Sequence, residues 1–519
     1  MRRRSCWVLA AVAGLAGCST APARPPAITP AAAATARLAE ADVLLRAGCY
    51  DCLLAASHAY NSVRTVPSAA VAATMGAARA AMLLAIRERE LGTEDSGYFT
   101  RANELAASTP AVQQAIAPLL EVVETLPARA SGGGRQVTDD RNLNRMQQAY
   151  RNRDAWLARL KSGADDDAAS AYVWLAFNCA YGTSTPESIR DWLSAASSWR
   201  DTPLLGFKAA TCGGFVNTAL DQLLANDSRF VEVNYFLGLR AMLSGKLDEA
   251  DDRLRRAYTW HPRWPAVTNA LGSVSLTAEE FQHALDFFDR TLDVVPQNPE
   301  GLLGRIRTLT YLGRHDDAIE SVDRLLALEH WYVGDARYWR ALNEAQLGRN
   351  DEAWTDVELA AKLLVNADVP KLAGLIAYRL QHLDVSQKKF EQARDRDPAD
   401  CETAFYLGIV LSDERAWARS AEVFAGAATC LQDAQARLTR EIETIRASND
   451  PPERKDRQIA KREAQIVDAR RMLSTSWFNT AVAYFNLDRR TEARQFAEKV
   501  ESDERFGERA RDLIARLAK

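Results

Sequence analysis

Between residues 231 and 434 the chain repeats itself about every 34 residues, and this period limits its fold more than any other feature. Six segments align, with a slip of one residue around the fourth, and they begin at Val231, Pro265, Pro299, Gly334, Ala367 and Cys401. The eighth position is small except once, and its residues are Gly238, Gly272, Ile306, Ala341, Gly374 and Gly408. The twentieth position is always small, with Ala250, Ala284, Ala318, Ala353, Ser386 and Ser420. The twenty-fourth position is always apolar, with Leu254, Phe288, Val322, Val357, Phe390 and Phe424.

A period of this length indicates stacked copies of one supersecondary unit, here a pair of antiparallel helices. Small residues at positions eight and twenty would let the two helix backbones approach closely. Glycine readily adopts the left-handed conformation that ends a helix, and it stands where the first helix must stop, at Gly245, Gly313 and Gly348. Proline cannot continue a helix, and it follows the second helix at Pro262, Pro296 and Pro398.

This pattern resembles the tetratricopeptide repeat (TPR). The resemblance implies an all-α fold, a right-handed superhelical solenoid of TPR-type helix pairs. Six units occupy residues 231–434, and a carboxy-terminal unit is expected at 474–519, where Trp477, Ala481, Tyr484 and Ala493 match the pattern. Stacked repeats of this kind usually serve as binding surfaces.

The segments that flank the six units are less regular. Residues 435–473 form a highly charged helical insertion, which we expect to be either a projecting hairpin or extended helices of the neighbouring repeats. Its charges indicate either a solvated face or a contact with a partner. Residues 38–130 and 135–230 are expected to hold degenerate helical repeats, separated by a loop at Ser131–Gly134. A separate amino-terminal helical domain is the alternative.

The amino terminus carries the marks of an export signal. Arg2, Arg3 and Arg4 precede a short apolar run that ends in Leu15-Ala16-Gly17-Cys18. This segment resembles the lipobox of bacterial lipoproteins, which implies cleavage of residues 1–17 and lipidation of Cys18. The alternative is an ordinary secretory signal with a chance cysteine. Ser19 follows the cysteine, and in that family a residue other than aspartate there favours the outer membrane.

The lipobox resemblance implies a location in the cell envelope. We expect an outer-membrane lipoprotein whose body lies in the periplasm, attached to the membrane through its lipid. Residues 18–37 are rich in proline and alanine and are expected to form an extended tether. No later apolar stretch is expected to have the length of a transmembrane helix.

Six further cysteines remain after Cys6 and Cys18, an even number that suggests disulfides in an exported protein. Cys401 and Cys430 lie at the start and the end of one helix pair and are the favoured bridge. Cys179 and Cys212 are 33 residues apart, and whether they pair stays open. Cys49 and Cys52 form a CxxC motif, which we interpret as a structural disulfide at a helix turn, with a redox motif as the alternative.

The sequence offers no recognisable catalytic constellation. The six histidines do not form the H-E-x-x-H zinc site, and neither a phosphate-binding loop nor a serine-nucleophile motif occurs. We therefore expect no enzyme activity, no cofactor and no metal. The net charge of −4 and the lack of a basic stripe also argue against nucleic-acid binding.

In the TPR family, positions two, five, nine, twelve and thirteen of each unit line the concave face. This resemblance implies a candidate binding face at Tyr235, Met242, Asn269, Arg307, Tyr311, Tyr338, Gln346, Lys371, Tyr378, Arg379 and Phe405. Each of these residues could instead pack against a neighbouring helix. Trp260 and Trp264, which flank Pro262, could likewise bind a partner, but packing between repeats is the favoured interpretation.

Two functions remain open from the sequence. The first is a scaffold that binds protein partners in an envelope, secretion, pilus or polysaccharide-export assembly. The second is a surface lipoprotein that binds glycans or nutrients for an outer-membrane transporter. The charged insertion lacks aromatic residues, which weakens the second hypothesis.

Overall fold

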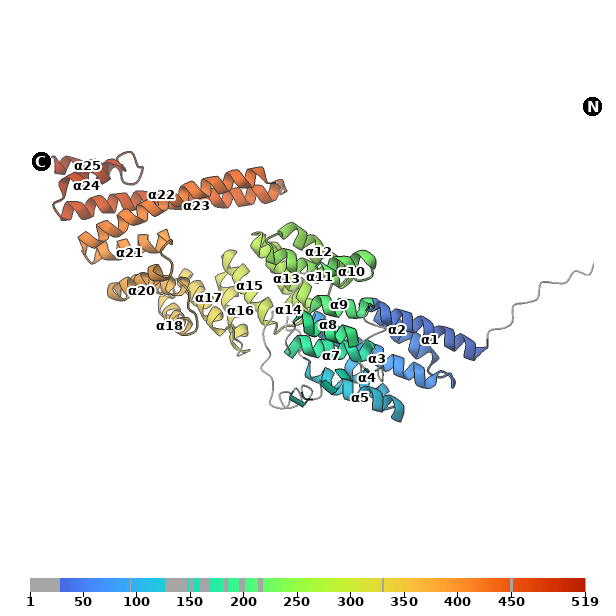
Figure 1. The fold of residues 1–519 in the computed structure, drawn as a ribbon. Coiled ribbons are helices and arrows are strands. Elements are labelled where there is room, and N and C mark those ends of the chain that lie inside the picture. Colours follow the sequence, from blue (N-terminus) through green and yellow to red (C-terminus); the bar gives the residue numbers. More distant parts are fainter. Residues whose placement is uncertain are drawn as a thin grey trace, which may run out of the picture.

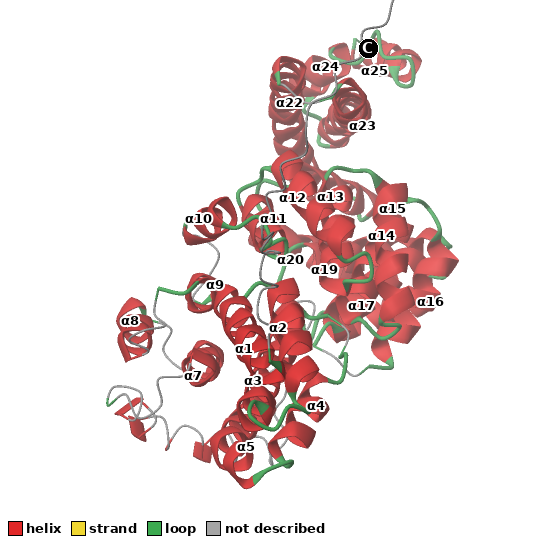
Figure 2. Cartoon of the chain, turned by 90° about the vertical axis from the view of Figure 1, so that its right-hand side faces the viewer, coloured by secondary structure: helices red, strands yellow, loops and turns green. Residues whose placement is uncertain are grey.

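The computed structural model describes residues 29–93, 95–126, 168–181, 185–195, 201–212, 218–328, 331–448 and 451–518, with a few positions between 147 and 162. In these ranges every regular element is a helix, and the helices form an elongated all-α repeat solenoid, as predicted (Figures 1 and 2). The signal segment, Cys18 and the loop at Ser131–Gly134 lie outside the described residues.

An amino-terminal lobe precedes the regular repeats. Its helices are α1 (Pro30–Ala47), α2 (Tyr50–Val63), α3 (Ala70–Leu91), α4 (Tyr98–Ala106), α5 (Pro110–Thr125), α7 (Ala168–Tyr181), α8 (Pro186–Ala195), α9 (Pro203–Thr211) and α10 (Ala219–Asn226). Helix α3 contacts α1, α2, α4, α5 and α7, so it is the central helix of this lobe. Residues 30–37, expected to be part of an extended tether, are helical, because α1 already begins at Pro30. The Thr29 hydroxyl caps α1 by accepting a hydrogen bond from the Ala32 amide at 3.2 Å.

Helix α3 corrects one sequence-based expectation. Its 22 residues, with a mean hydropathy of 1.4 over the most apolar window, are long and apolar enough to cross a membrane. However, 72% of that window is buried inside the lobe. Alanines dominate the helix and let its neighbours approach on all sides, so α3 is explained as the core helix of a globular lobe.

The regular repeats follow as consecutive helix pairs. They are α11 (Val233–Leu243) with α12 (Leu247–Trp260), α13 (Pro265–Thr277) with α14 (Phe281–Val294), α15 (Pro299–Tyr311) with α16 (His315–Leu326), α17 (Val333–Gln346) with α18 (Asn350–Ala360), α19 (Asp368–Arg379) with α20 (Leu383–Arg396), and α21 (Cys401–Asp413) with α22 (Trp417–Ala447). In Figure 1 they form an arc, from green near the lobe to orange.

The structure explains the small residues at position eight. A methyl group added at Gly408 would lie 2.7 Å from the Phe424 ring, and one at Gly374 would lie 2.9 Å from the Phe390 ring. Each phenylalanine occupies position twenty-four of the unit that contains its glycine. The apolar side chain of the second helix therefore fills the space that position eight leaves empty, and it is fully buried there.

Every helix pair turns through the same left-handed residue at position fifteen. Glycine occupies it in three units, and Glu279 (φ 63°), Gln381 (φ 62°) and Arg415 (φ 60°) occupy it in the others. Asp488 (φ 58°) makes the same turn at position fifteen of the segment that begins at Ser474. A side chain other than glycine costs on the order of 1 kcal/mol in this conformation.

The charged insertion is a helical hairpin built from extended repeat helices, so the two alternatives from the sequence are both realised. Helix α22 runs on from the sixth unit, and α23 (Pro452–Asn486) runs into the last helices, α24 (Arg490–Glu498) and α25 (Gly507–Leu517). The base of the hairpin is apolar, with Ala428 and Leu431 packed against Ala469 and Leu473. We call residues 434–448 and 451–473 the strap, because Figure 1 shows this hairpin running back over the arc toward α12 and α13.

Candidate binding surfaces

The amino-terminal lobe and the first repeats share one hydrophobic core. Cys49, Leu91 and Phe207 of the lobe pack in the same cluster as Phe236 and Trp264 of the repeats. Phe207 stacks on Phe230 and meets Phe236 edge to face, with centroid distances of 6.0 and 5.8 Å. The lobe is therefore joined to the solenoid by a close-packed interface.

A buried charged pair lies at the centre of this junction. Arg87 of α3 and Glu232, just before α11, are both fully buried, and their side chains are 2.7 Å apart. Arg87 also donates to the Gly48 carbonyl at 3.0 Å, and its guanidinium lies 3.6 Å from the centre of the Phe207 ring. Glu232 accepts a hydrogen bond from the Tyr50 amide at 2.9 Å. Burial raises the pKa of Glu232, while the Arg87 charge opposes this shift.

The CxxC motif belongs to the same junction. Cys49 and Cys52 are bonded, with their Cα atoms 4.9 Å apart, and both are buried. The Cys49 sulfur caps α2 by accepting from the Cys52 amide, which directs the Tyr50 amide at Glu232. This setting agrees with the structural interpretation of the motif.

The two tryptophans beside Pro262 pack against the lobe. Trp264 is fully buried and donates to the Leu91 carbonyl at 2.7 Å. Trp260 donates to the Asp51 carboxylate at 3.0 Å and meets the Tyr50 ring edge to face. Both indoles therefore pack within this chain, but their partners here belong to the lobe, whereas packing between repeats was the favoured interpretation.

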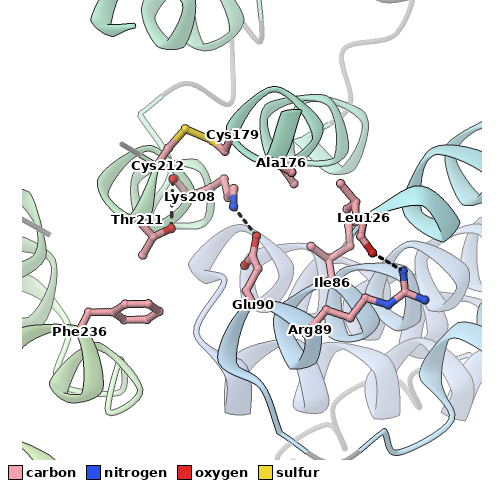
Figure 3. A pocket seen from close by; sticks show the side chains of 11 residues that line it. Ile86, Arg89, Glu90, Leu126, Ala176, Cys179, Lys208, Thr211, Cys212 and Phe236 are labelled. Atoms are coloured by element: carbon pink, nitrogen blue, oxygen red, sulfur yellow. Dashed lines mark hydrogen bonds and ion pairs between the residues drawn. A yellow bond between two sulfur atoms is a disulfide. The ribbon is translucent and has the colours of Figure 1, made fainter. Parts of the chain in front are cut away.

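A pocket of about 230 Å³ opens beside the junction (Figure 3). Its walls are apolar at Ile86, Leu126 and Phe236, and the Cys179–Cys212 disulfide lies along one side. Figure 3 shows Lys208 pointing at Glu90, and their charged atoms are 2.6 Å apart. Glu90 also accepts from Tyr172 at 2.6 Å, and Arg89 donates to the Leu126 carbonyl at 3.4 Å. These charged groups already have partners within the chain. We therefore interpret the pocket as part of the junction between the lobe and the repeats.

The favoured pair Cys401–Cys430 is bonded, and so is the pair Cys179–Cys212, which the sequence left open. The Cα atoms of Cys179 and Cys212 are 5.4 Å apart, and those of Cys401 and Cys430 are 5.5 Å apart. The first pair joins α7 to the end of α9, so the spacing of 33 residues spans neighbouring helices in the lobe. The second joins the start of α21 to α22, as expected for one helix pair.

The predicted concave-face residues fall into two groups. Tyr235 and Phe405 are buried, at 6% and 7% exposure, and pack against Trp264 and Phe424 respectively, which is the alternative role foreseen for them. Tyr338 is also largely enclosed, and burial raises its pKa to about 12. The others lie at least partly at the surface, and they are Met242, Asn269, Arg307, Tyr311, Gln346, Lys371, Tyr378 and Arg379.

Three of these surface residues are held by this chain. Lys371 lies 2.9 Å from Asp400 and 2.6 Å from Glu402. Tyr378 donates to Asp413 at 2.9 Å, and Arg379 donates to the Ala345 carbonyl. These contacts tie neighbouring repeats together, so the fifth and sixth units leave fewer polar groups available than the sequence pattern suggested.

Repeats two to four present a different surface, which we call the aromatic–arginine patch (Phe281, Arg307, Tyr311 and Trp339). Tyr311 is 53% exposed and lies between Phe281 and Trp339, with centroid distances of 5.2 and 6.2 Å. The exposed Arg307 lies 6.0 Å from the Trp339 ring. The concave positions of the TPR family identified Arg307 and Tyr311. They missed Phe281, which begins the second helix of its unit, and Trp339, which occupies position six.

Two carboxyl groups in the units that carry this patch were also missed. Glu300 and Asp335 occupy position two of the third and fourth units, and burial raises the pKa of both, to about 7 for Glu300. Neither carboxylate oxygen of Glu300 receives a hydrogen bond from another residue. The charge of Arg307 lowers the pKa of Asp335 and so opposes its burial. Position two is one of the concave positions of the TPR family, so the repeat pattern could have identified both carboxyl groups.

Comparisons with known proteins add little to this picture. No family model matches the chain. Among curated proteins, anaphase-promoting complex subunit 3 of Schizosaccharomyces pombe (strain 972 / ATCC 24843) is 26% identical over 94 residues, which is 18% of this chain. The match spans only 14% of the length of that relative.

Several solved structures are similar at low identity. The APC/C hetero-tetramer Cut9-Hcn1 gives a TM-score of 0.39 at 13% identity, over 95% of this chain and 97% of that chain. A tetratricopeptide repeat protein from Parabacteroides merdae gives 0.33 at 16% identity, over 58% and 100%. YrrB, described as a TPR protein with an unusual peptide-binding site, gives 0.30 at 15% identity, over 34% and 91%. Such values carry no argument about function, and the fold assignment rests on the helix pairs described above.

Proposed function

We propose that the chain is a membrane-anchored scaffold whose concave repeat surface binds a segment of a protein partner in a cell-envelope assembly. The aromatic–arginine patch is the observation that carries this proposal. Tyr311 and Arg307 are exposed, and Trp339 beside them is partly buried. Tyrosine, tryptophan and arginine are the residues that dominate the energy of protein interfaces. Here they lie on adjacent repeats, where an extended segment would cross several first helices in succession.

The patch also has the electrostatics of a binding surface. Arg307 supplies a cation at its edge, and Asp335 supplies a neighbouring carboxylate. A ligand that covered Tyr311 would exclude water from both charges and strengthen its hydrogen bonds to them. The patch can therefore hold the apolar side chains and the backbone groups of a polypeptide together.

The location is the second part of the proposal. Lipidation of Cys18 would attach the chain to the outer membrane and place the repeats in the periplasm, where secretion, pilus and polysaccharide-export assemblies are built. Three disulfides between described cysteines are consistent with an oxidising compartment. Replacing Cys18 by serine should release the protein from the membrane fraction, and continued membrane association would refute the anchor.

A photocrosslinker tests the binding surface in living cells. Placed at Tyr311, it should give a discrete protein adduct, because this side chain is exposed within the patch. Glu320, exposed on α16 in the same repeat, is the matched control and should give none. Arg307→Ala should weaken the Tyr311 adduct. Equal labelling from both positions would refute a dedicated face, and glycan binding without any protein adduct would favour the nutrient-binding alternative.

A further inference from the structure

The strap reaches back to the first two repeats and binds them through charged side chains. Arg457 of α23 lies 2.6 Å from Glu280, and Lys461 forms an ion pair with Glu279. Arg462 lies 3.7 Å from the same Glu279. Arg454 forms an ion pair with Asp248 at the start of α12. The partners are 177 to 206 residues apart in the sequence, so these contacts close a large loop of the chain.

The two sides of this contact carry opposite charges. All four strap residues are basic, and all three partners are acidic residues at the turns of the first two helix pairs. Glu279 occupies the left-handed turn position where glycine would be relaxed. The side chain that makes this backbone conformation costly is therefore the one that receives two cations from the strap.

The contact is partly exposed. The side chains of Arg457 and Lys461 are 43% and 45% exposed, whereas those of Glu280 and Glu279 are 20% and 19% exposed. A polar cavity of about 400 Å³ lies between the strap at Arg454 and Gln458 and the turn at 245–249. Exposed ion pairs contribute little each and are screened by salt, because water and ions compete for both charges. The tip is thus held far more weakly than the apolar base of the hairpin.

The strap lies on the side of the arc that carries the first helices. In Figure 1, α15 and α17 lie nearer to α22 and α23 than their partners α16 and α18 do. Figure 2, turned by a quarter, again places α15 closer to the strap than α16. Tyr311 ends α15, and Trp339 lies on α17, so these two residues of the aromatic–arginine patch belong to first helices, on the side of the arc where the strap lies.

We infer that the strap is an ionic gate, which closes the concave surface by binding the acidic turns of the first two repeats and opens to admit a partner. The opening itself is a property of this chain alone. Only the admission of a partner rests on the proposed function. The gate requires no rearrangement of the core, since the base of the hairpin and the repeat contacts stay in place while the tip separates.

Spin-label distance measurements test the opening without any partner. The full chain, with Cys6→Ser and Cys18→Ser, would carry labels at Thr277 and Asp456, which are exposed on opposite sides of the contact. At low ionic strength we expect one short, narrow distance distribution. At about 1 M salt, or with Glu279→Arg and Glu280→Arg, we expect at least about a fivefold larger population at longer distances, because screening or repulsion removes the ion pairs. An unchanged distribution overturns the gate.

A charge exchange is the control for specificity. Glu280→Arg alone should open the strap, and adding Arg457→Glu should close it again, because the pair is restored with its charges reversed. Glu279→Gly keeps the turn and removes only the carboxylate, so it should open the strap in a correctly folded chain. If the double variant stays as open as Glu280→Arg, charge complementarity does not hold the strap, and the inference is wrong.

The crosslinker at Tyr311 then distinguishes a gate, which controls access of a partner, from a brace, which only stiffens the arc. In the open variant Glu279→Arg and Glu280→Arg, a gate predicts a several-fold higher yield of the partner adduct. An equal yield in a strap shown to be open overturns the gate and leaves a brace that only stiffens the arc. No adduct in either form refutes the proposed function instead, while the distance measurement still decides whether the strap opens.

Discussion

Arg87→Ala should destabilise the junction between the lobe and the repeats by about 3–5 kcal/mol, the usual effect of breaking a buried ion pair from one side. The substitution leaves the Glu232 carboxylate buried without its cation, and one of its oxygens already lacks a hydrogen bond. It also removes the donor to the Gly48 carbonyl and the contact with the Phe207 ring. Removing both charges with Arg87→Met and Glu232→Leu should cost less than Arg87→Ala, because no unpaired charge remains, although the Tyr50 amide and the Gly48 carbonyl still lose their side-chain partners.

The pH dependence of this variant follows from Glu232. Burial already raises its pKa, and loss of Arg87 raises it further. The folded variant then takes up a proton that the unfolded chain has lost, so the variant becomes less stable as pH rises above the ordinary range of a glutamate. The destabilisation relative to the parent chain should therefore be smaller at pH 5 than at pH 8.

Hydrogen exchange during urea unfolding is the suitable assay, because a long repeat array need not unfold in one step. Peptides from α2, α3 and α11 should lose protection earlier in Arg87→Ala, while those from α19 to α21 should not change. Arg101→Ala is the control, since its pair with Glu104 is about half exposed and should contribute under about 1 kcal/mol. A destabilisation of α3 by less than about 1.5 kcal/mol, or one equal to the control, would refute the assigned role of the pair.

Three further predictions concern a glycine, a carboxyl group and a disulfide. Gly408→Ala should destabilise the sixth unit by about 1–3 kcal/mol, because the new methyl group would lie 2.7 Å from Phe424; Gly426→Ala, with nothing within 4 Å, should be neutral or stabilising in thermal unfolding. Because burial raises the pKa of Glu300 from 4.5 to about 7, stability should fall as pH rises through that window. Glu300→Gln should recover about 1–2 kcal/mol at pH 8, a value reduced for its partial exposure, and none at pH 4. Cys401→Ser with Cys430→Ser should lower stability by about 2–4 kcal/mol, and mass spectrometry of unreduced peptides should recover all three bridges; free thiols throughout would contradict them.

The sequence was sufficient for the repeated part of the fold because each unit carries its own local pattern. Position eight is small and position twenty-four is apolar in the same unit, so both partners of the Gly408–Phe424 contact lie 16 residues apart and recur with the period. Turns with Glu279, Gln381 and Arg415 were less visible, because the left-handed conformation there is imposed by packing and not by glycine. The start of α1 was missed because proline and alanine suit both a tether and the first turn of a helix.

The candidate sites depended on contacts that leave no local pattern. Arg87 and Glu90 belong to a run of four charges near the end of a largely apolar helix, but nothing nearby in the sequence identifies Glu232 or Lys208 as their partners. The basic residues of the strap are likewise surrounded by acidic ones, and only the folded arc selects Glu279 and Glu280. Trp339 joins Tyr311 across two repeats, so a rule applied unit by unit could not find the patch.

The long loops closed by the junction and the strap also set an order on folding. In a simple solenoid each unit needs only its neighbours, so structure can spread along the chain as it is made. Here the Tyr50 amide donates to Glu232, which lies 182 residues later in the chain, and Arg457 binds Glu280, which lies 177 residues earlier. The chain must therefore emerge beyond residue 232 before the lobe is complete, and beyond residue 457 before the arc is closed. Contacts this distant slow folding, because the loop must close before the contacts lower the free energy. The apolar α3 would therefore stay exposed in a chain that stalls before the first repeat.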